Sequence, residues 1–204
     1  MVENIESFWE WFEANESTII EAIKDKNRGD YSFLVNTLDN LVLSFGRLGW
    51  EIGHGKNKPY FLTLSPNNDR ELLAVTKKIV AAAPTKKSWE FNPAKLPVDW
   101  DLKFEVYDND FEEHTIDATS WHQVLKQRSD GSINLFLKAD NIHFLDHETK
   151  MRTVDMVVTS ILGEELRIHR INKIKLIEDF EDKHHNRKAP IHILRKQVLG
   201  FDEK

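Results

Sequence analysis

Cysteine is absent from the chain of 204 residues. This absence excludes disulfide bonds, thiolate metal ligands, cysteine nucleophiles and cysteine-bound iron–sulfur clusters. Any chemistry is therefore left to histidine, carboxylate and hydroxyl groups. A chain of this length buries roughly 70% of its unfolded surface, so it can fold without such cross-links.

Long apolar runs are also missing. No stretch approaches the ~20 apolar residues of a transmembrane helix. The first six residues are acidic and contain neither the basic region nor the apolar region of a signal peptide. Neither end carries a lipidation motif. We therefore expect a cytoplasmic protein that does not associate with a membrane.

Positive charge occurs only in local clusters, such as Lys86-Lys87 and the stretch 183–196, which also contains apolar residues. The formal net charge is −6, from 28 basic and 34 acidic residues. Neither half of the chain is basic, whereas a nucleic-acid-binding protein usually carries a concentrated positive face. We therefore expect no nucleic-acid partner. An acidic protein can instead attract a basic protein partner through complementary fields.

Recognised catalytic motifs are lacking as well. The sequence contains no GxGxxG, Walker, HExxH or GxSxG pattern. No set of four metal ligands can be assembled from its motifs. We therefore expect no cofactor and no bound metal, and the sequence identifies no enzyme class.

Three histidines are nevertheless candidates for a pocket in a cleft between two lobes: His54, His114 and His122. His54 lies between two glycines, where a histidine can titrate near neutrality. The structural alternative is a hairpin loop in which the glycines supply positive φ angles. The run Glu112-Glu113-His114, with His122 nearby, has the residue types of an acid–base or metal site.

Aromatic residues are abundant near the N-terminus, which holds two of the six tryptophans. Trp9 and Trp11 diverge by about 200° on a helix, so aromatic rings cover a wide arc of its surface. This arc indicates either a helix packed between two layers or a partner-binding surface. The partner-binding hypothesis comprises Trp9, Trp11, Phe12 and, in the proline-containing connector, Trp100. The alternative is that the tryptophans belong to the core and to a junction between lobes.

The first half of the chain predicts two helices, a hairpin, a further helix and a strand. A capping-box pattern predicts a helix start at Ser7, with a kink or break near Asn15. The other elements expected here are a helix over 31–48, strands around 50–52 and 60–65, a helix from about 69 to 83 and a strand over 89–91.

The second half predicts more strands, with one long helix over 148–162. The turn 108–110 follows the first of these strands. We expect strands over 102–106, 133–137, 142–145, 166–176 (as a hairpin or a bulged strand) and 191–194, and a short helix over 120–125.

Together these elements predict an α+β fold. N-terminal helices precede a mixed or mainly antiparallel sheet with helices packed on it. We place two associated lobes at 1–97 and 98–204, and the alternative is one compact domain.

Several short segments of the first half resemble a group of uncharacterised bacterial proteins. These proteins open with an FWxWFxxNE segment, which here is 8–16, and share segments that match Glu51-Ile52-Gly53 and Trp89-Glu90-Phe91. The resemblance implies a bacterial, cytosolic, mixed α/β domain. It transfers no catalytic residue.

The sequence favours a non-catalytic protein-binding or regulatory domain, for example one resembling an antitoxin or an immunity protein. The arguments are the missing motifs, the acidic charge and the aromatic arc. The alternative is an enzyme or small-molecule binder that uses the histidines and nearby carboxylates. A homodimer is compatible with either interpretation.

Overall fold

Two separate hydrophobic cores organise the computed structural model, which describes residues 2–25, 29–181 and 187–201. The chain divides into two compact units, Met1–Lys95 and Leu96–Lys204. Each unit combines helices with small sheets of paired strands, which confirms the expected α+β class.

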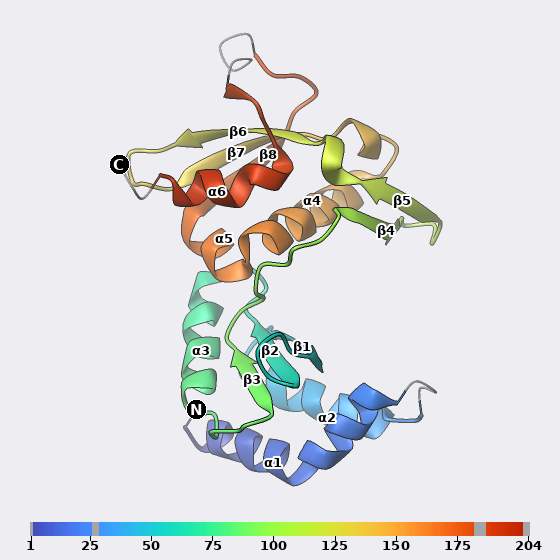
Figure 1. Cartoon of the computed structure of the whole chain (residues 1–204), viewed down its shortest axis with the longest axis vertical. Helices are drawn as coiled ribbons and strands as arrows, with labels where there is room; N and C mark the ends of the chain where they lie inside the picture. The colour runs from blue at the N-terminus through green and yellow to red at the C-terminus, as the bar shows by residue number, and fades with distance from the viewer. Residues whose placement is uncertain (1, 26–28, 182–186, 202–204) are drawn as a thin grey trace. The chain divides into compact units, whose positions relative to one another are not determined.

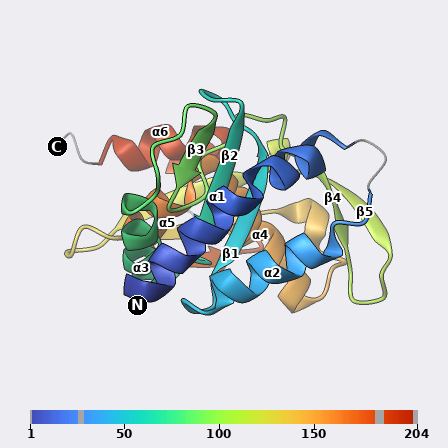
Figure 2. The ribbon, with the colours of Figure 1, turned by 90° about the horizontal axis from the view of Figure 1, so that it is seen from below.

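The first unit contains a three-stranded sheet with β2 in the centre, antiparallel to β1 and parallel to β3. Helices α1 and α2 cross one face of this sheet (Figures 1 and 2). The elements are α1 (Val2–Lys24), α2 (Ser32–Leu43), β1 (Gly49–His54), β2 (Tyr60–Ser65), α3 (Arg70–Ala81) and β3 (Trp89–Asn92). The Asp69 carboxylate caps α3 by accepting hydrogen bonds from two amides of its first turn.

Helix α1 begins five residues earlier than the capping-box pattern predicts, at Val2 rather than Ser7. Ile5, Phe8 and Phe12 form a buried stripe with helical spacing, so packing favours helix upstream of the cap signal. Of the kink or break expected near Asn15, the break is absent. Its side-chain amide donates to the carbonyl of Trp11 at 2.8 Å, and the helix continues to Lys24.

The aromatic residues of α1 form the centre of the first core. Trp9 is 5% exposed, and its indole nitrogen donates to the carbonyl of Ile79 at 2.9 Å. The Phe12 ring lies edge-on to that of Trp89 at 4.9 Å between centroids. The indole of Trp89 in turn donates to Glu16 at 3.0 Å, so the cluster also satisfies its polar atoms.

The second unit contains a four-stranded sheet of order β8-β7-β6-β9 and a separate two-stranded ribbon, β4–β5. Helices α4, α5 and α6 lie on one side of the four-stranded sheet (Figure 1). The strands are β4 (Lys103–Tyr107), β5 (Glu113–Asp117), β6 (His122–Gln127), β7 (Ile133–Lys138), β8 (Ile171–Leu176) and β9 (Ala189–Pro190). The helices are α4 (His147–Leu162), α5 (Glu164–Arg170) and α6 (Leu194–Leu199), with 3-10 turns η1 (Ala118–Ser120), η2 (Asp140–Ile142) and η4 (Ile191–Ile193).

Two predictions at one end of this sheet are wrong. The short helix expected over 120–125 is the start of β6, because Trp121 is held extended by its contacts. Its indole donates to Asn141 at 2.6 Å and its carbonyl accepts from the amide of Ile191. The strand expected over 142–145 is a turn, in which Ile142 and Leu145 are buried three residues apart.

One further strand prediction, and part of another, are helices in the structure. Of the hairpin or bulged strand expected over 166–176, residues 171–176 do form a strand, β8, and its pairing with β7 shifts register between Ile171 and Lys173, as the expected bulge near Asn172 requires. Residues 164–170 instead form α5, with Glu164 and Glu165 in its first turn and three basic residues in its last. This arrangement matches the helix dipole. The C-terminal segment forms η4 and α6, because Ile191, Leu194 and Val198 are buried with helical rather than alternating spacing.

The core position of Trp9 yields a stability prediction. We expect Trp9→Ala to lower the free energy of unfolding by about 3–5 kcal/mol, because it empties a buried site. Trp11→Ala is the matched control, since Trp11 is only partly buried, and should cost about half as much. Urea unfolding followed by circular dichroism measures both. Equal losses would contradict the assigned packing.

Candidate functional site

The β4–β5 ribbon, residues 103–117, extends away from the four-stranded sheet of its unit (Figures 1 and 2). Its strands are antiparallel, with Lys103 opposite Asp117 and Tyr107 opposite Glu113. A two-stranded ribbon is marginal by itself, so it must bury one face elsewhere. Phe104, Val106 and Ile116 supply that face and pack against the second core.

The other face of the ribbon is exposed and polar. Successive side chains of a strand alternate between faces, which places Lys103, Glu105 and Tyr107 together on this side of β4. The Tyr107 hydroxyl donates to Glu113 at 2.6 Å. The pKa of Tyr107 is raised, mainly by this hydrogen bond and secondly by the negative charge of Glu113. Lys103 lies 3.3 Å from Asp117.

The ribbon carries most of the chain's excess charge. It contains six acidic residues and one lysine, a net −5, whereas the whole chain has −6. The remaining residues are therefore almost balanced. The acidic residues of the ribbon are Glu105, Asp108, Asp110, Glu112, Glu113 and Asp117.

The tip of the ribbon, residues 108–112, is a tight turn closed by a hydrogen bond from the Asp108 amide to the Glu112 carbonyl. The Phe111 amide donates to the Asp108 carbonyl, and Phe111 itself has φ +62°. Three-residue hairpin loops place a left-handed residue here, usually glycine, because a side chain is disfavoured at this angle. Phe111 occupies this position with 87% of its surface exposed.

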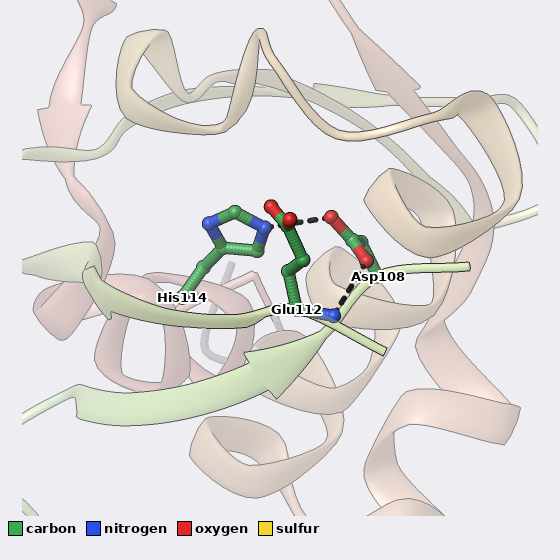
Figure 3. A group of neighbouring side chains, drawn as sticks. All are labelled: Asp108, Glu112 and His114. Atoms are coloured by element: carbon green, nitrogen blue, oxygen red, sulfur yellow. Dashed lines mark hydrogen bonds and ion pairs between the residues drawn. The ribbon is translucent and has the colours of Figure 1, made fainter. Parts of the chain in front are cut away.

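The Asp108 carboxylate organises this turn (Figure 3). One oxygen accepts from the amides of Asp110 and Glu112 at 2.9 and 3.0 Å. The other lies 2.7 Å from Nε2 of His114 on β5. The pKa of Asp108 is lowered, mainly by the hydrogen bond with His114 and secondly by the hydrogen bond from the Glu112 amide.

One group of side chains in the described part of the chain could hold a metal ion. It consists of Asp108, Glu112 and His114. One ligand atom from each lies within 4.8 Å of the other two. A histidine nitrogen and two carboxylate oxygens could ligate a divalent cation with water completing the shell. Figure 3 shows the Glu112 carboxylate beside the Asp108–His114 contact. The hydrogen bonds of the turn already account for the positions of Asp108 and His114 without an ion.

The predicted histidines are dispersed over different elements. His54 is exposed at the end of β1 in the first unit. In the second unit His122 begins β6, and its Nδ1 lies 2.9 Å from the Ser120 carbonyl. His114 contacts Asp108 and the ring of Phe144 instead, at 4.7 Å between centroids. Of the three, His114 is the one within a group of potential ligands.

The four residues of the partner-binding hypothesis are distributed between the two units. Trp9 and Phe12 are buried in the first core, which corrects the expectation that they face a partner. Trp11 is half-buried against the same core. Trp100 packs against the second core, with its ring 5.5 Å from that of Phe104.

Sequence reasoning missed the residues that expose apolar surface on the ribbon, Tyr107 and Phe111. Asp108 and Asp110 do predict the turn, but nothing in the local sequence indicates that an aromatic residue occupies its left-handed position. The available signal was the local charge, because six of fifteen residues over 103–117 are acidic.

Comparisons with known proteins leave the site without a precedent. No family model, curated protein or solved structure matches the chain. Among the described helices, none combines the length and apolar character needed to cross a bilayer.

The left-handed backbone at Phe111 predicts that a glycine is better tolerated there. We expect Phe111→Gly to raise the free energy of unfolding of the second unit by about 1 kcal/mol, because glycine adopts positive φ without strain. Phe33→Gly is the matched control at a similarly exposed phenylalanine, in the first turn of α2. It should lower the free energy of unfolding, by at most the roughly 0.5–1 kcal/mol that glycine costs in the middle of a helix. Destabilisation by both changes in urea titrations would contradict the prediction.

The lowered pKa of Asp108 predicts how the tip responds to acid. Its carboxylate stabilises the turn above its ordinary value of 3.8, and this contribution is lost as pH falls through the lowered folded value. Amide NMR shifts of Asp110 and Glu112 should therefore change together as the pH falls below 3.8. In Asp108→Asn this shared transition should disappear. Its persistence in the variant would assign it to another group.

Proposed function

We propose that the chain is a non-catalytic protein-binding domain whose contact element is the β4–β5 ribbon. The observation that carries this proposal is Phe111, an aromatic side chain held in solvent on a backbone angle that favours glycine. Exposure and strain together disfavour this residue for folding. A cost of this kind at one position is typical of residues retained for function.

A second aromatic residue of the ribbon supports a protein partner. Tyr107 is more than half exposed, and aromatic residues are enriched in the binding hot spots of interfaces. On the opposite face of the ribbon, the half-exposed Phe144 lies against His114, which is itself anchored to the turn through Asp108. The ribbon thus exposes Tyr107 and Phe111 on a hairpin whose turn is held by several hydrogen bonds.

The charge of the ribbon supports a basic partner. A net −5 on fifteen residues attracts positive surfaces and speeds association at low ionic strength. An antitoxin- or immunity-like role would be one instance of such binding.

The test is capture of proteins from a native host lysate on the immobilised chain. We compare the wild type with Phe111→Ser and with Phe33→Ser, which removes an equally exposed phenylalanine from the first unit. The proposal predicts proteins that the wild type and Phe33→Ser retain and Phe111→Ser loses, identified by quantitative mass spectrometry.

Two outcomes would contradict the proposal. In one, all captured proteins remain on Phe111→Ser at wild-type levels. In the other, Phe33→Ser loses the same proteins as Phe111→Ser. Circular dichroism of each variant establishes that it is folded, so that lost capture reflects the surface.

A further inference from the structure

The outer edge of β4 has backbone groups that point away from the ribbon. The hydrogen bonds at the two ends of the ribbon join Asp108 to Glu112 and Ala118 to Leu102. Bonded pairs alternate along an antiparallel ladder, so Phe104 and Val106 carry the bonds to β5. The amide and carbonyl groups of Glu105 and Tyr107 therefore face outward.

No strand of the described residues covers this edge, because β4 pairs with β5 alone. Lys103 differs from its neighbours in that its amide donates to the Asp101 side chain at 3.2 Å. The accessible stretch therefore centres on Glu105 and Tyr107. An uncovered edge of this kind is a template for a strand from another molecule.

The two faces beside the edge determine which strand fits it. Glu105 and Tyr107 lie on the exposed face, where Glu113 adds a second negative charge. An added strand would place alternate side chains next to these groups, and opposite charges stabilise such cross-strand pairs. Its other side chains would extend the apolar face formed by Phe104 and Val106, both only partly buried.

We infer that the outer edge of β4 binds an extended segment of a protein partner in which basic residues alternate with apolar residues. The segment would add a third strand to the ribbon through the backbone of Glu105 and Tyr107. This inference rests on the proposed function, because it specifies how the ribbon engages its partner.

The test uses the full chain and a synthetic heptapeptide of alternating lysine and valine. Amide NMR should show shifts centred on Glu105 and Tyr107 as the peptide is added. A glutamate–valine peptide of the same length should not bind. A lysine–valine peptide with alternate backbone nitrogens methylated keeps its charge but loses its donors, and should bind about tenfold more weakly.

Two charge-reversing variants test the role of Glu105. Glu105→Lys should weaken the lysine–valine peptide by about fivefold, because it replaces an attractive cross-strand pair with a repulsive one. Glu10→Lys is the matched control, since it changes the net charge equally at an exposed position of α1. Its affinity for the peptide should equal that of the wild type.

Several results would overturn the inference. They are that the lysine–valine peptide does not bind, that the methylated or the acidic peptide binds as tightly as it does, and that the amide shifts lie outside β4.

Self-association of the chain is a separate outcome. Light scattering that increases with protein concentration, together with amide shifts at β4, would identify a second copy of the chain as the occupant of the edge instead. If the peptide result fails while capture still depends on Phe111, the ribbon binds proteins by another geometry. If the peptide binds and capture does not depend on Phe111, the proposed function fails and the edge pairing stands.

Discussion

The need to bury one face of a two-stranded ribbon is the constraint that determines the character of the candidate site. Phe104, Val106 and Ile116 satisfy it by packing against the second core. Alternation along each strand then places the remaining side chains in water, where charged groups are tolerated. The exposed face follows from that anchoring, whereas the uncovered edge follows from the pairing of β4 with β5 alone.

The tip shows how local chemistry maintains an unfavourable residue. Asp108 accepts hydrogen bonds from two backbone amides of the turn and contacts His114 on the returning strand. This network defines the turn whatever residue occupies position 111. Phe111 can therefore adopt a left-handed angle without unravelling the ribbon, and its ring remains in solvent.

Much of the fold could be predicted from the sequence, because helical or alternating spacing determines most elements. The buried residues of α2, spaced at Leu34, Leu38 and Val42, are of this kind. The failures occur where long-range contacts override local signals. Trp121 is extended because of its bonds to Asn141 and Ile191, which no local pattern encodes. Segments 164–170 and 191–199 are short, and their few apolar residues are compatible with either periodicity.

The candidate site was less accessible to sequence reasoning. Aromatic abundance drew attention to Trp9 and Phe12, but size and hydrophobicity equally predict burial, and both lie in the first core. Residue type alone singles out His114 as a candidate, whereas its pairing with Asp108 depends on the hairpin register. The exposure of Phe111 depends on a backbone angle that the sequence does not display.

Hydrogen exchange of the chain alone and in complex with a protein captured from the host lysate measures whether the ribbon is the contact element. Amides of 103–117 should gain protection on binding, above all those of Glu105, Tyr107 and Phe111. Protection that is gained elsewhere in the chain, with the exchange of the ribbon unchanged, would contradict the assignment of the ribbon as the contact element.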